Sequence, residues 1–198
     1  MSIRCWPPSS VYIPTGVIDR SDLSSDLLSV YGIPLHGLKN NDGTTLAAAA
    51  AAGLFGIISA GMGTGTAVLA GEAASGNSKT STAMFLFTLP VEYVAAGAVT
   101  LSLDVKESVG AATVATTFSC EAYKSDGRGA VGANIAGAPS ATDVTINWAT
   151  ITSVITSAGL SAGDILTVFI RLVCNDAGGA VGTIAQVGRV RLLLTVKG

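Results

Sequence analysis

The chain has 198 residues, with 11 Lys and Arg against 13 Asp and Glu and a net charge of -2. This length fits one domain with an extension. Only 12% of the residues are charged, which excludes attraction to nucleic acid or anionic lipid by a long-range field. A surface so poor in charge favours association, so we expect a protein that works within an assembly.

Residues 1–43 are predicted to form an extended arm, because four of the chain's prolines lie there and exclude long helices and central strands. Within the arm, residues 21–31 are predicted as a short helix with one apolar stripe. We expect the arm to be mobile in the free protein and to become ordered at an interface. Its candidate interface anchors are the large apolar and aromatic side chains Trp6, Tyr12, Leu23, Leu27, Leu28 and Tyr31.

The uncharged segment 46–70 raises the question of a membrane span. It is mostly Ala and Gly, and its few large apolar side chains favour insertion too weakly, so no spanning helix is expected. We predict a pair of strands joined by a glycine-rich turn at residues 61–65. The N-terminus also lacks the features of a secretory signal, so export by the usual route is not expected.

From residue 79 onward, polar and apolar residues alternate in strand-length runs separated by turns. In residues 99–106, for example, every odd position is Val or Leu and every even position is polar. The predicted strands are 82–89, 99–107, 113–123, 142–151, 165–175 and 184–197. With one or two strands from residues 44–72, the total of about eight predicts an all-β jelly-roll sandwich with antiparallel strands. The predicted sandwich domain is 44–198.

Strand parity also predicts which side chains lie in the core, because alternate residues of a strand point to opposite faces. The residues predicted to be buried are Leu101, Leu103, Phe118, Ile146, Trp148, Val168, Ile170, Leu172, Leu192 and Leu194. Trp148 shares its parity with Val144 and Ile146, which places the largest side chain of the set in the core.

The residues that could carry chemistry are few and scattered. The one histidine, His36, has no partners for a nucleophilic triad or a metal site, and is interpreted as a surface or interface residue. The odd count of cysteines (Cys5, Cys120 and Cys174) argues against a disulfide framework and against zinc. We therefore expect no enzyme activity, no cofactor and no metal.

Other polar and aromatic residues suggest two alternative roles, a calcium site and a carbohydrate-binding surface. Asp126, Asp164 and Asp176 lie in turns and have oxygens that suit calcium, but Asp in a Gly-containing turn is explained by bonds to its own backbone. The exposed aromatic residues are too scattered for a carbohydrate-stacking platform. Both patterns are more typical of structural roles.

Residues 85–97, 121–129, 160–164 and 188–198 resemble, in pattern and order, the jelly-roll cement or decoration proteins of tailed bacteriophages. The resemblance extends over residues 44–198. It implies a virion structural protein, assembled in the host cytoplasm, that binds the major capsid protein on the capsid exterior across subunit joints. It also implies a homo-oligomer, commonly a trimer, with neither nucleic acid nor membrane as a partner.

Two other functions remain open from the sequence. One is a different virion component, such as a head fibre or a tail part. The other is a free carbohydrate-binding β-sandwich module, because a sandwich fold does not by itself define a function.

Overall fold

The computed structural model describes residues 26–48, 50, 53–58, 67–108, 114–125, 132–140, 143–178 and 182–197. These residues form β-strands and one short 3-10 helix, η1 (Leu35–Gly37). Among them, no helix has the length and apolar character needed to cross a membrane.

The strands, in chain order, are β1 (Leu27–Ile33), β2 (Gly56–Ile58), β3 (Val68–Ala70), β4 (Ser78–Thr88), β5 (Val99–Glu107), β6 (Val114–Ser125), β7 (Ala136–Pro139), β8 (Asp143–Val144), β9 (Ala149–Ile155), β10 (Ile165–Asp176) and β11 (Ala185–Val196). They form two antiparallel sheets. The large sheet has the order β2-β3-β11-β5-β9-β7, and β1 also pairs with β11. The small sheet has the order β4-β10-β6-β8.

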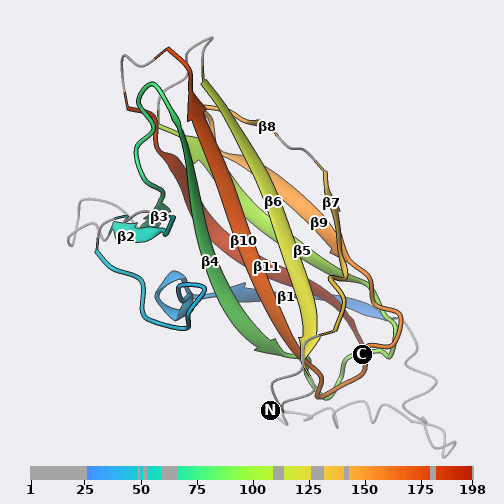
Figure 1. The fold of residues 1–198 in the computed structure, drawn as a ribbon. Helices are drawn as coiled ribbons and strands as arrows, with labels where there is room; N and C mark the ends of the chain where they lie inside the picture. The colour runs from blue at the N-terminus through green and yellow to red at the C-terminus, as the bar shows by residue number, and fades with distance from the viewer. Residues whose placement is uncertain are drawn as a thin grey trace, which may run out of the picture.

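The two sheets lie face to face as a sandwich, with β4, β10 and β6 in one layer and β5, β9 and β11 in the other (Figure 1). The predicted all-β sandwich is confirmed. The long strands follow their predicted ranges closely, and β5 occupies residues 99–107 as expected. The strand pair expected in segment 44–72 is also present, as β2 antiparallel to β3. The turn predicted at residues 61–65 lies outside the described residues.

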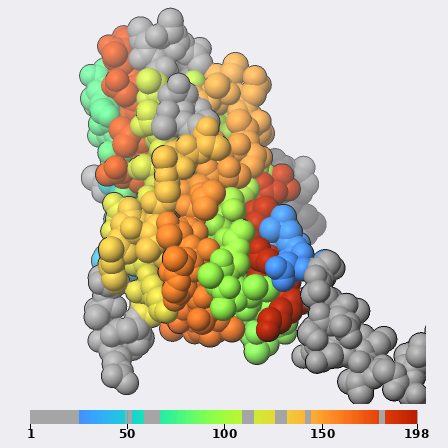
Figure 2. Space-filling model, turned by 90° about the vertical axis from the view of Figure 1, so that its right-hand side faces the viewer, coloured from blue at the N-terminus to red at the C-terminus, as the bar shows by residue number. Residues whose placement is uncertain are grey.

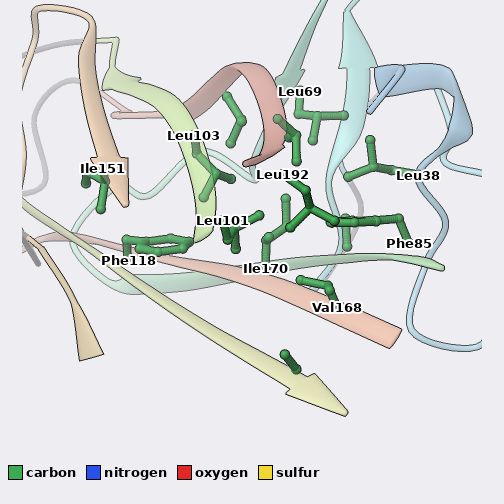
Figure 3. Packing of buried hydrophobic residues seen from close by; sticks show 14 of the residues in the cluster. Leu38, Leu69, Phe85, Leu101, Leu103, Phe118, Ile151, Val168, Ile170 and Leu192 are labelled. Carbon is green, nitrogen blue, oxygen red and sulfur yellow. The ribbon is translucent and has the colours of Figure 1, made fainter. Parts of the chain in front are cut away.

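The core fills the space between the sheets with the inward rows of the long strands. Leu101, Leu103 and Leu192 of the large sheet face Phe118, Val168 and Ile170 of the small sheet (Figure 3). Eight of the ten predicted core residues are at most 3% exposed: Leu101, Leu103, Phe118, Val168, Ile170, Leu172, Leu192 and Leu194. Alternate residues of each long, unbroken strand therefore point into the core as predicted.

The prediction that Ile146 and Trp148 are buried is wrong. Their side chains are 52% and 47% exposed, and Asn147 between them is exposed as well. The expected single strand 142–151 is broken by a bend at residues 145–148. Before the bend β8 pairs with β6 of the small sheet, and after it β9 pairs with β5 of the large sheet. Because the chain crosses between sheets at the bend, parity does not continue through it.

The helix expected at residues 21–31 is wrong for residues 27–31, which belong to strand β1. This strand pairs with β11 along its whole length, from Leu27 opposite Val196 to Ile33 opposite Val190. The described end of the arm thus adds a strand to the large sheet. The division of the chain at residue 43 stays a prediction.

We expect Leu101→Ala to lower the free energy of unfolding by about 2–5 kcal/mol, because it leaves a cavity in the centre of the core. Leu86→Ala removes the same atoms from a side chain that is 60% exposed, so its cost should be within about 0.5 kcal/mol. Urea unfolding of both variants measures the difference. Equal losses would contradict the assigned burial.

Candidate functional site

The predicted interface anchors fall into three groups. Trp6, Tyr12 and Leu23 lie outside the described residues. Leu27 and Leu28 lie on β1 and are 50% and 64% exposed. Tyr31 also lies on β1 but points inward, where its ring meets Phe87 edge-on at 5.5 Å. The structure therefore leaves Leu27 and Leu28 available for contact and gives Tyr31 a packing role.

A row of apolar side chains crosses the outer face of the large sheet. Val30 of β1 lies opposite Leu193 of β11, which lies opposite Thr100 of β5, which lies opposite Val154 of β9. Val30 and Val154 are 59% and 60% exposed. Leu28 points outward beside this row. We call Leu28, Val30, Leu193, Thr100 and Val154 the apolar band.

Strand β1 forms an edge beside the apolar band. It lies at the surface beside β11 (Figure 2), and among the described strands it pairs with β11 alone. Its sequence, LLSVYGI, holds no charged residue and no proline. Edge strands are ordinarily protected from pairing with other chains by such residues. The band and the edge together form a surface suited to contact with another protein.

A polar network occupies the same outer face, next to the apolar band. Asp104 of β5 accepts hydrogen bonds from Thr150 of β9 at 2.8 Å and from Arg191 of β11 at 2.8 Å, and it also pairs with Arg189. Burial alone would raise the pKa of Asp104. The bond from Thr150 and the two guanidinium groups outweigh burial and hold that pKa below its ordinary value.

The small sheet carries a shallow depression of about 220 Å³ on its outer face. Its lining includes Arg171 and Phe169 of β10, Glu121 of β6, Thr82 of β4 and Asn41 of the loop after η1. Arg171 is exposed, and its Nε donates to the hydroxyl of Ser119 at 2.9 Å. The depression therefore combines an aromatic ring, Phe169, with a positively charged side chain, Arg171, and a negatively charged one, Glu121.

A second aromatic ring, that of Tyr123, contacts Phe169. Tyr123 stands edge-on to Phe169 with ring centres 6.0 Å apart, and its hydroxyl donates to Glu121 Oε2 at 2.6 Å. That hydrogen bond raises the pKa of Tyr123, because removing the phenol proton would place two negative charges together. Sequence reasoning missed this pair.

The described residues offer little for covalent or metal chemistry. Burial raises the pKa of the Cys120 and Cys174 thiols, which disfavours the reactive thiolate. Cys5 lies outside the described residues. His36 is exposed in η1, as a surface residue would be. No group of three metal-ligating side chains is present in the described part of the chain.

The turn aspartates have local roles where they are described. Asp164 accepts from the Ser161 amide at 2.7 Å and pairs with Lys124 at 2.8 Å. Asp176 is 2% exposed and accepts from the Gly178 amide at 3.2 Å. Both contacts fit the interpretation that these residues stabilise their own turns. Asp126 lies outside the described residues.

Comparisons with known proteins assign no family. No family model and no curated protein matches the chain. Among solved structures, it is similar to TmCBM61 in complex with β-1,4-galactotriose, with 14% identity, a TM-score of 0.37, and coverage of 84% of this chain and 88% of that one. It is also similar to the family 11 carbohydrate-binding module of the cellulosomal cellulase Lic26A-Cel5E of Clostridium thermocellum. There the identity is 14%, the TM-score 0.34, and the coverage 88% and 92%.

Both structures are distant, and at such TM-scores neither carries an argument about what this chain binds. The comparisons also give no support to the resemblance to phage decoration proteins, which therefore stays a proposal.

We expect Asp104→Asn to destabilise the protein by about 1–3 kcal/mol at pH 7, because hydrogen bonds to a charged partner are lost. The folded-state pKa of Asp104 is lowered, so its contribution is present above the unfolded value of 3.8 and lost as pH falls through the folded value. The difference between the two proteins in urea unfolding should shrink below about pH 4. A constant difference down to pH 2 would contradict the ion-pair assignment.

Proposed function

We propose that this chain is a non-catalytic β-sandwich module that acts by binding, and that its apolar band attaches it to a protein shell. The capsid decoration proteins of tailed phages, which the sequence resembles, act in this way. The observation that carries the proposal is the exposed apolar band beside the edge of β1, a strand without charged residues or proline.

The energetics favour contact over exposure at this surface. Burying a Val or Leu side chain that would otherwise meet water contributes about 1.5–3 kcal/mol. Leu28, Val30 and Val154 are each at least 59% exposed, so a partner that covers them gains from all three. The band itself contains no charged side chain that would have to be desolvated.

A small contact surface such as the apolar band is sufficient for attachment to a shell when several copies bind at once. A homo-oligomer, such as the trimer expected from the sequence, presents several bands to neighbouring shell subunits at once. Contacts that are weak singly then hold together, because the second and third bind at high effective concentration. A shell clamped across its subunit joints resists outward pressure better than the bare shell. The partner in this proposal is the major capsid protein, on the exterior of the virion.

The test substitutes two side chains of the apolar band and leaves the core residues unchanged. Val30→Asp and Val154→Asp, each on the outer face, should abolish co-sedimentation with empty heads of the phage that carries this chain. The matched control, Thr167→Asp, places the same charge on the outer face of the small sheet and should bind like the native protein. Loss of binding in the control alone would assign attachment to the small sheet.

Light scattering of the purified protein measures its oligomeric state separately from its binding to heads. The expected result is an oligomer at micromolar concentration. A monomer that still binds heads would remove the multivalent part of the proposal, and a monomer that binds none would remove the attachment as well.

A second candidate function is carbohydrate binding, and the depression on the small sheet favours it. Phe169 and Tyr123 provide apolar ring surface, while Arg171, Glu121 and Asn41 provide hydrogen-bonding groups around it. Apolar surface with a few convergent polar groups is the usual composition of small-ligand sites. A neutral oligosaccharide would meet both kinds of group there.

We expect Phe169→Ala and Arg171→Ala to weaken binding of neutral β-1,4-linked oligosaccharides about tenfold or more, measured by calorimetry. Thr88→Ala, at the end of β4 and outside the depression, serves as the matched control. No detectable binding by the native protein would remove this candidate function and leave the attachment proposal unaffected.

A further inference from the structure

Trp148 lies on the outer face of the large sheet, where the core does not need it. Its side chain is 47% exposed. It precedes β9 but reaches across to β11, because its six-membered ring lies directly against Gly188. A Cβ added to Gly188 would come within 3.0 Å of Trp148 Cη2. Because Gly188 has no side chain, the indole can pack directly against the backbone of β11 at this position.

One cation, Lys106, lies against this ring, and a second, Arg189, is the residue that follows Gly188 on β11. Lys106 Nζ lies 5.1 Å from the ring centre. The Arg189 side chain is 68% exposed, and only its Nε is used by Asp104 among the described residues. Its terminal nitrogens therefore remain available to an anion. No described carboxylate forms an ion pair with Lys106.

The local charge balance is positive. Among the outward-facing residues of β5 and β11, Lys106, Arg189 and Arg191 bring three positive charges and Asp104 brings one negative charge, which leaves +2. The whole chain has a net charge of -2, so the cluster stands out against its own protein. Asp104 is held by Thr150 and both arginines, so its oxygens fix the arginines in place.

We propose that Trp148, Lys106 and Arg189 form a binding site for an acidic glycan, meaning a chain of uronic-acid sugars. A pyranose ring would lie on the exposed part of the indole. Its carboxylate would pair with the terminal nitrogens of Arg189 and with Lys106, as charge-assisted hydrogen bonds. An acidic peptide would satisfy the cations but would leave the broad indole surface unused, which is why a ring-bearing anion fits better.

This site is independent of the function proposed above. On the same face, the row formed by Thr152, Ser102 and Arg191 lies between the proposed site and the apolar band. A substitution can therefore remove the glycan site and leave the apolar band intact, or the reverse.

The test is calorimetric titration with oligogalacturonate at low ionic strength, with the neutral galactose oligomer as comparison. The native protein should bind only the acidic oligomer, and more weakly as salt is added. Trp148→Ala and Arg189→Ala should each weaken binding about tenfold or more. Lys197→Ala, which removes one positive charge beyond the far end of β11, is the matched control and should bind normally.

Gly188→Ala perturbs the ring without removing a charge, since its added Cβ would lie 3.0 Å from Trp148 Cη2 and the indole must shift by a few tenths of an ångström. It should weaken binding by less than Trp148→Ala does, and its Trp fluorescence should change. Thermal unfolding shows that each variant is folded. Unchanged binding in both Trp148→Ala and Gly188→Ala would overturn the proposal, because charge alone would then explain it. Tighter binding of poly-glutamate than of the sugar would overturn it in favour of an acidic peptide.

Discussion

The pleat of β5 is the constraint on which the rest of this structure depends. Its odd residues, Val99, Leu101, Leu103 and Val105, are 0% exposed and form the centre of the core. Its even residues must then face the other side of the large sheet. Thr100 joins the apolar band, Asp104 organises the arginines, and Lys106 lies by Trp148. One alternating strand therefore specifies both the packing of the sandwich and the order of features on its outer face.

The two outer faces have different chemical character. The large sheet combines an apolar band at the β1 end with a cationic, aromatic cluster at the other, separated by a row of hydrogen-bonded polar side chains. The small sheet has a depression lined by Phe169 and Arg171. Because two faces of a sandwich point in opposite directions, attachment through one leaves the other exposed to a further ligand. Attachment through the apolar band is therefore compatible with a ligand in the depression, whereas the Trp148 site shares the face that carries the band.

Long, unbroken strands could be predicted from the sequence because alternation is a local signal that burial of one face enforces. The signal failed where the chain changes sheets: nothing in residues 145–148 shows that β8 and β9 belong to different layers. It failed again at β1. Leu27 and Tyr31 share a face in a helix and in a strand, and pairing with β11 decides between them. The cluster at Trp148 was missed for the same reason, since it brings together residues from two strands, β5 and β11, and a bend.

Hydrogen exchange of the protein, alone and bound to empty phage heads, tests attachment through the apolar band most directly. Amides of β1 and β9 at the band should exchange more slowly in the bound state, because a partner covers them. Amides of β10 around Phe169 should keep their rates. Slower exchange at β10 with no change at β1 and β9 would contradict the account, since the shell would then contact the small sheet.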